Sequence, residues 1–157
     1  MSEPQQPLFT IEKIYVKDLS VEVPNAPAIF LEREAPKIDV QMNTQGGPIG
    51  EDVYQVLLTV TVSATVGERT MFLVEAAQGG IFRIAGVPVE QMELVLGITC
   101  PNLLFPYVRE TISDAVSRAG FMPLYLNPVN FEAIYAQRMQ AAQAQMPNAQ
   151  AEATRPN

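Results

Sequence analysis

The longest run of alternating apolar and polar residues in the chain begins at Tyr54. Every second residue from there is apolar, and the residues between them are mostly threonine, serine and glutamine. Because successive side chains of a strand point to opposite faces, the run predicts a long strand with one apolar and one neutral-polar face. Gly67 can adopt positive φ, so residues 66–69 predict a turn into a second strand. The apolar set is Tyr54, Val56, Leu58, Val60, Val62, Ala64 and Val66.

The hairpin closed by this turn spans residues 53–82. Its second arm contains the β-rich run 70–77, then Gly79 and Gly80, then residues 81–84. A glycine pair inside a strand indicates either a bulge or a close approach of another part of the chain. The segment lacks the lysine and the glycine spacing of a phosphate-binding loop, so we interpret it as a bulged strand.

Alternation predicts two further strands before the hairpin, at residues 9–23 and 37–43. Four strands that follow one another through short turns predict an antiparallel sheet. In the first strand, strict parity places Asp18 and Glu22 on one face, together with Ile14 and Val16. The opposite parity holds Phe9, Ile11, Lys13, Tyr15, Lys17, Leu19, Val21 and Val23.

The segment between these two strands contains two prolines within residues 24–27, which favour an extended or turn path without ladder hydrogen bonds. Residues 28–31 then place bulky apolar side chains in a crossover loop. Two interpretations remain open for these side chains. They either pack onto the core of their own domain or line an adaptable apolar groove.

The spacing of apolar residues changes to that of helices after residue 87. A short helix is predicted from Pro88 to Gly97, and a longer one over residues 103–119 with Asn102 as its cap and Pro106 in its first turn. Gly120 is placed to end the longer helix. Asn130 can cap a last helix, whose apolar stripe is Phe131, Ile134, Tyr135 and Met139.

These elements make one α+β domain with a four-stranded antiparallel sheet over residues 9–140. Residues 1–8 are predicted to be a flexible arm. Residues 141–157 are rich in alanine and glutamine and are predicted to be a disordered tail, although alanine and glutamine can also extend the last helix by a turn or two.

Composition narrows the classes of partner. Of 157 residues, 17% are charged and 48% hydrophobic, so the surface must expose more neutral and apolar area than usual, which favours oligomerisation or partner binding. A net charge of −7 argues against nucleic acid and anionic membranes as partners. No signal peptide and no apolar run of about 20 residues is found, which predicts a cytosolic protein without direct membrane insertion.

The sequence offers little catalytic chemistry. It contains no histidine, which removes the commonest general base and the commonest metal ligand. Its single cysteine, Cys100, has no basic neighbour in sequence and is predicted to be a buried, inert thiol. No carboxylate cluster has metal-ligand spacing. We therefore predict a protein that is not an enzyme and that holds no metal or cofactor.

Three carboxylates lie within predicted strands, where propensity disfavours them: Asp18, Glu22 and Glu75. Leu73 shares a parity, and so a face, with Glu75. Such charges are either ordinary outward groups that discourage edge pairing or an acidic recognition face for a basic partner. The residues alone leave both interpretations open.

Five motifs, in order along the chain, give it a resemblance to the SecB export chaperones. The run Leu96–Glu110 (LGITCPNLLFPYVRE) is the most specific, and the match covers about residues 9–140. The other motifs are Ile14–Ser20, Pro24–Pro27, Gln78–Gly86 and Pro128–Phe131.

The resemblance implies a sheet with helices packed on one face, and a homotetramer built as a dimer of dimers. It implies a bacterial cytoplasmic chaperone that holds unfolded precursor proteins without ATP and delivers them to the SecA motor. A SecB-like chaperone dedicated to one partner, such as an antitoxin, is the alternative. The family's contact with the basic, zinc-bearing tail of SecA maps to Asp18, Glu22, Leu73 and Glu75. The client groove maps to Phe30, Phe131, Ile134, Tyr135 and Met139.

Overall fold

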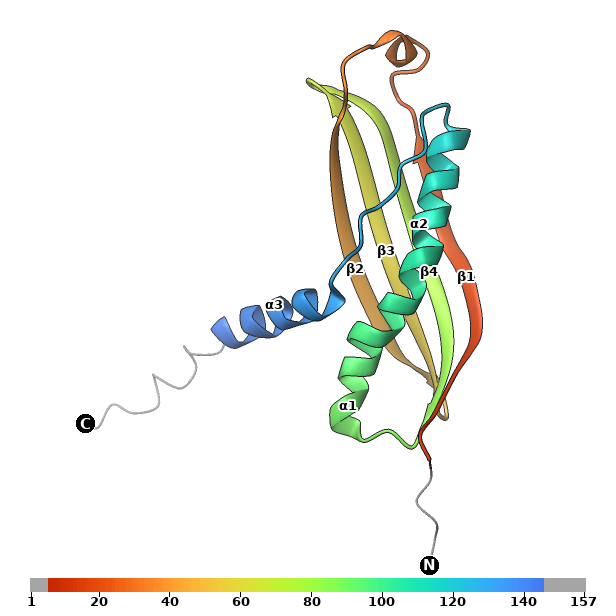
Figure 1. Cartoon of the computed structure of the whole chain (residues 1–157), viewed down its shortest axis with the longest axis vertical. Coiled ribbons are helices and arrows are strands. Elements are labelled where there is room, and N and C mark those ends of the chain that lie inside the picture. The colour runs from red at the N-terminus through yellow and green to blue at the C-terminus, as the bar shows by residue number, and fades with distance from the viewer. Residues whose placement is uncertain (1–5, 146–157) are drawn as a thin grey trace, which may run out of the picture. The chain divides into compact units, whose positions relative to one another are not determined.

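A computed structural model describes residues 6–145 of the chain. Its described residues form a four-stranded antiparallel sheet of order β1-β4-β3-β2, with helices after the last strand (Figure 1). They divide into two compact units between Asn127 and Pro128. The elements are β1 Leu8–Glu22, η1 Ala28–Leu31, β2 Lys37–Gly50, β3 Val53–Val66, β4 Arg69–Ala85, α1 Val89–Leu94, η2 Val95–Thr99, α2 Cys100–Arg118 and α3 Phe131–Ala144.

The predicted central hairpin is confirmed in β3 and β4. Gly67 adopts φ +60° in the turn between them, a conformation that suits a residue without a side chain. From Val56 to Val66 the predicted apolar parity of β3 is buried, and the alternate residues are partly exposed. A strand with a neighbour on each side and a helix over one face keeps strict alternation because any slip would expose its apolar set.

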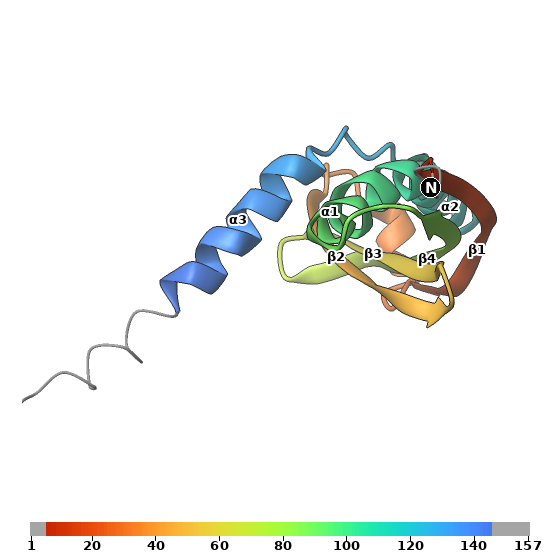
Figure 2. The same cartoon turned by 90° about the horizontal axis from the view of Figure 1, so that it is seen from below.

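Helices α1 and α2 lie on one side of this sheet (Figure 2). The buried stripe of α2 packs against β3 and β4 and includes Leu104, Val108, Ile112 and Val116. We call the sheet face under α2 the helix face and the opposite one the open face. The helix face holds the core of the first unit, and the predicted fold class is confirmed.

Strand β1 departs from the predicted parity. Its register against β4 shifts between Ile11 and Lys13 and again between Val16 and Asp18, so one extra residue bulges at each place. Each bulge reverses the faces of the residues that follow it. Tyr15 therefore lies on the open face, opposite Gly79, together with Asp18 and Glu22. Phe9, Ile11, Ile14, Val16, Leu19 and Val21 turn to the helix face instead.

The glycine pair in β4 is not a bulge, so our interpretation as a bulged strand is wrong. The register of β4 does not shift at either glycine: its pairing with β1 shifts at residues of β1, and its pairing with β3 shifts at Met71, far from the glycine pair. The alternative, close approach, is what the structure shows. A Cβ on Gly79 would lie within 3 Å of the Tyr15 ring, and one on Gly80 within 3 Å of Phe82 and Leu104.

The helical segment after β4 is continuous from Val89 to Arg118, which corrects three predictions. Gly97 lies inside the π-helical turn η2, where the Cys100 N–H donates to the Val95 carbonyl, and it lacks the positive φ that ends a helix. Asn102 does not cap, because α2 already begins at Cys100 and Asn102 lies inside its first turn. Pro106 consequently falls in the helix interior and not in the first turn.

Both predicted ends of the later helices are confirmed. Gly120 has φ +97°, and the N–H of Phe121 donates to the Val116 carbonyl at 3.2 Å while the N–H of Gly120 donates to Ser117 at 3.1 Å. This paired pattern is a Schellman motif, which satisfies the last carbonyls of α2. At the start of α3, the side chain of Asn130 accepts a hydrogen bond of 3.0 Å from the Ala133 N–H.

The predicted domain limits differ from the elements at both ends. Strand β1 already includes Leu8, and α3 continues to Ala144, beyond the predicted start of the tail at residue 141. Residues 1–5 and 146–157 of the arm and tail lie outside the described residues. Over the described part of the chain, none of the helices combines the length and apolar character needed to span a membrane.

Candidate functional site

The open face is an ordered grid, because residues that oppose each other across an antiparallel pair share a face. We call a set of opposing open-face residues a row and name it by its β4 member. In the Leu73 row, Leu73 lies between Glu22 of β1 and Ser63 of β3. The Glu75 row places Ser20 and Thr61 beside Glu75, and the Ala77 row places Asp18 and Thr59 beside Ala77.

The four residues predicted to contact SecA are therefore gathered by the fold. Asp18, Glu22, Leu73 and Glu75 occupy three consecutive rows on the neighbouring strands β1 and β4, and we call them the acidic surface. Rows are about 7 Å apart and neighbouring strands about 4.8 Å apart. All four side chains thus fit within one small protein contact.

The carboxylates of the acidic surface are exposed, and none of them forms an ion pair within residues 6–145. The ion pairs found there join Arg69 to Glu32, Arg83 to Glu12 at 2.6 Å, and Arg118 to Asp114 at 2.9 Å. Asp18, Glu22 and Glu75 take part in none of them. A cationic partner would therefore meet three free negative charges around a half-buried leucine.

Thr61 is a member of this site that sequence reasoning missed. Its hydroxyl donates to Oε2 of Glu75 at 3.0 Å, which fixes the carboxylate in one orientation. The register of β3 and β4 shifts by one residue between Ala64 and Thr65, which leaves Met71 unpaired. Without that shift Thr61 would oppose Val74, so the turn position alone does not reveal the contact.

Asp39 is a second open-face residue that was not singled out. It opposes Ser63 and therefore extends the Leu73 row onto β2, where it is exposed. This row runs Asp39, Ser63, Leu73 and Glu22 across the whole sheet. The alternation of residues 37–43 places Asp39 outward, but the position of β2 at the far edge of the sheet becomes visible only in the topology.

The crossover loop confirms core packing for Ile29, and the groove interpretation of residues 28–31 stays a prediction. Ile29 is buried in the core, whereas Phe30 remains 48% exposed. The Phe30 ring stacks on Phe121, with centroids 5.0 Å apart, and Phe121 in turn contacts Phe72 at 5.1 Å. Phe30 thus presents a partly exposed aromatic ring that is held in place by Phe121.

The same loop is tied to the turn end of β4 by polar contacts. Asn25 donates to the Thr70 carbonyl at 2.9 Å, and Arg69 forms an ion pair with Glu32. The backbone N–H groups of Glu34 and Arg33 bind the Glu32 carboxylate and, with Arg69, lower its pKa. These contacts hold the position from which Phe30 projects.

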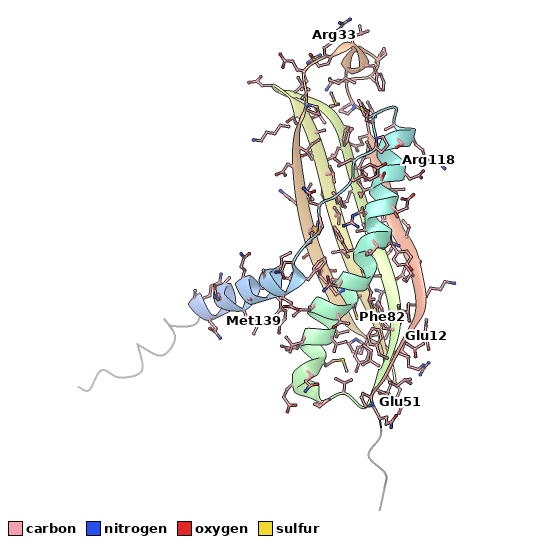
Figure 3. All side chains as sticks on the ribbon, in the orientation of Figure 1. Glu12, Arg33, Glu51, Phe82, Arg118 and Met139 are labelled. Atoms are coloured by element: carbon pink, nitrogen blue, oxygen red, sulfur yellow. The ribbon has the colours of Figure 1, made fainter. Side chains whose placement is uncertain are left out.

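The other predicted groove residues belong to the second unit. Phe131, Ile134, Tyr135 and Met139 recur at helical spacing in α3, where Ile134 and Met139 are exposed. Met139 projects from the helix (Figure 3). Because Phe30 lies in the first unit and these four lie in the second, the groove between them stays a prediction.

Cys100 is the single cysteine, and it lies in the core of the first unit. Its side chain is fully buried, and burial raises its pKa to about 12. A thiol that holds its proton at neutral pH is a poor nucleophile and a poor metal ligand. The prediction that this thiol is buried is confirmed, and its raised pKa agrees with the prediction that it is inert.

Sequence comparison places the whole domain in one family. The family model described as "Preprotein translocase subunit SecB" matches residues 2–142. A protein-export protein SecB of Thiobacillus denitrificans is 63% identical over 150 residues, covering 96% of this chain and 99% of the relative. A protein of the same name from Dechloromonas aromatica is 62% identical over 140 residues, covering 89% and 92%.

Structural comparison agrees on the fold. A SecB-like chaperone of Mycobacterium tuberculosis, solved with a peptide of the HigA1 antitoxin, superposes with a TM-score of 0.65. The alignment covers 78% of this chain and 91% of that one at 16% identity. At this identity the likeness shows a shared architecture.

Proposed function

The chain belongs to the SecB family, and from this premise we propose that it is an ATP-independent chaperone of the bacterial cytoplasm that holds unfolded precursor proteins and delivers them to SecA. The observation that carries the delivery step is the acidic surface. Three exposed carboxylates lie around Leu73 on the open face and form no ion pair within residues 6–145, an arrangement that suits a basic protein partner.

Holding an unfolded client needs apolar surface and not chemistry. Phe30 on the crossover loop, with Ile134, Tyr135 and Met139 of α3, supplies aromatic and flexible side chains that tolerate many client sequences, whereas the predicted groove residue Phe131 is buried. Each contact can be weak. Several such sites on one assembly bind one long chain by avidity, so a slowly folding precursor is retained while a fast folder escapes.

The pairing step of a tetramer built as a dimer of dimers is supported by β1. This edge strand pairs with β4 along one side. Large apolar residues of its helix face are 40–46% exposed. A monomer with an unpaired edge and an apolar fringe is prone to association, and a second copy of the chain would cover both. The exposed set is Phe9, Ile11, Val16, Leu19 and Val21.

A chaperone dedicated to one antitoxin is the weaker proposal. The relatives above 60% identity carry the name protein-export protein SecB. The chaperone solved with an antitoxin peptide is only 16% identical to this chain, so that likeness supports the fold alone.

The experiment compares Asp18→Lys/Glu75→Lys with the unaltered protein in SecA titration and in aggregation suppression of an unfolded precursor. Charge reversal is expected to weaken SecA binding by at least tenfold, since two attractive contacts become repulsive, and to leave client holding intact. Glu68→Lys/Glu34→Lys is the matched control, because both residues are exposed and lie off the open face. Unchanged SecA affinity in the first variant would exclude the acidic surface as the docking site.

A further inference from the structure

The open face contains a hollow beside the acidic surface. It has a volume of about 250 Å³ and lies between β2 and β3 near their connecting turn. The residues that line it, all within 45–57, are neutral. Pockets for drug-sized ligands or cofactors start near 300 Å³ and are more enclosed, so this one suits a single side chain. Its walls include Gln45, Ile49, Gln55 and Leu57.

Gly47 forms the floor of the hollow. It opposes Gln55, so a side chain at this position would point to the open face. A Cβ built on Gly47 meets nothing within 4 Å, whereas a Cβ on Gly46 would point to the helix face and lie 3.2 Å from Val56. The hollow therefore exists because glycine leaves its floor bare, and nothing in residues 6–145 fills it.

The hollow is continuous with the acidic surface. Leu57 belongs to the Gly79 row, and the next row along the sheet is the Ala77 row, which contains Asp18. Tyr15 joins the two regions. Its ring lies over the bare backbone of Gly79, and its hydroxyl donates to Oε1 of Gln55 at 2.5 Å, which fixes one wall of the hollow.

We propose that this hollow binds a large apolar side chain of the same basic partner that meets the acidic surface, so that docking uses two points, one electrostatic and one apolar. The proposal deepens the function proposed above and rests on it. The partner chemistry follows from the face itself. The acidic surface requires a cation, while the neutral hollow with Leu57 and Ile49 in its walls gains nothing from a charge and favours burial of an apolar group.

The grid also fixes the spacing between the two points. From Glu75 the hollow lies two to three rows along the sheet and one to two strands across, a distance of roughly 15–22 Å. An extended chain spans that distance in about five to seven residues. The partner segment should therefore carry a basic residue and a leucine, methionine or aromatic residue at this separation.

The test measures binding of purified full-length SecA to the assembled chaperone at low and high salt. Gly47→Leu fills the hollow from its floor, and Gly50→Leu is the matched control. Gly50 is also a β2 residue in ordinary backbone geometry, lies outside the hollow, and would place a Cβ 3.9 Å from Val53. Asp18→Lys/Glu75→Lys reports on the electrostatic point.

We expect Gly47→Leu to weaken SecA binding about tenfold at both salt concentrations, because burial of an apolar group is not screened. Gly50→Leu should bind like the unaltered chain, and all variants should hold client equally. If Gly47→Leu binds SecA with unaltered affinity, or Gly50→Leu is weakened as much, the hollow is not a docking point. If charge reversal has no effect, the acidic surface itself fails, which is a separate result.

Discussion

The two faces of the central hairpin are built from alternate residues of the same strands, yet one face is packed under helices and the other is open to a partner. On the helix face, every second residue of β3 from Val56 to Ala64 is completely buried under α2. On the open face, the intervening residues of β3 are threonine, serine, glutamine and Leu57, all partly exposed. The difference teaches where a substitution will act. Changes on the helix face should alter stability, and changes on the open face should alter binding.

The difference in stability between the two faces can be tested most directly at two adjacent leucines. Leu58→Ala should lower the free energy of unfolding by about 2–5 kcal/mol, because it leaves a cavity in the core. Leu57→Ala, one residue away on the open face, should cost about 1 kcal/mol or less. Urea denaturation at one fixed protein concentration measures both, since assembly contributes to apparent stability. Equal losses in the two variants would contradict the assignment of the faces.

The residues on these faces show what the sequence could predict. Strand β3 has a neighbour on both sides and a helix above it, so its alternation alone assigned the buried set. Strand β1 has one neighbour, and its two bulges are set by how it pairs with β4. Strict parity therefore placed Tyr15 on the wrong face, although it placed Asp18 and Glu22 together correctly.

The limits at the helices and at the site have similar causes. Gly97 has the sequence signature of a helix end, but a π-helical turn lets the helix continue through it. At the site, the family motifs identified the four residues of the acidic surface. Thr61 was missed because its pairing with Glu75 depends on an unpaired Met71, which no local pattern reveals.

Gln78 places a buried side-chain amide on the helix face, and replacing it tests the hydrogen bonds made there. Its Nε2 donates to the Tyr15 carbonyl at 3.2 Å, and its Oε1 accepts from Thr111 of α2 at 3.1 Å, so it links β1, β4 and α2. Gln78→Leu should lower the free energy of unfolding by about 1–3 kcal/mol, because the Tyr15 carbonyl loses its side-chain partner. Gln41→Leu, at an exposed open-face position of β2, should change it by no more than about 0.5 kcal/mol. A stability gain in Gln78→Leu would show that apolar packing outweighs this network.

A pair of glycines repeats the comparison with a single methyl group. Gly80→Ala should destabilise by about 1–2 kcal/mol, because its Cβ would lie within 3 Å of Phe82 and Leu104 in the packed core. Gly47→Ala, which meets open space, should be neutral or stabilise by about 0.5 kcal/mol through the unfolded chain. Thermal denaturation of the two variants decides between them, and a loss of the same size in both would mean that strand glycines matter here for backbone conformation.

The smallest expected effect concerns Thr61, where binding should change and stability should not. Thr61→Val keeps the shape of the side chain and removes the hydroxyl that holds the Glu75 carboxylate at 3.0 Å. The freed carboxylate must then be oriented when SecA binds, so affinity should fall two- to fivefold, or about 0.5–1 kcal/mol. Thr59→Val, one row away beside Ala77, is the matched control. An equal change in both variants would mean that open-face polarity matters and that Thr61 does not position Glu75.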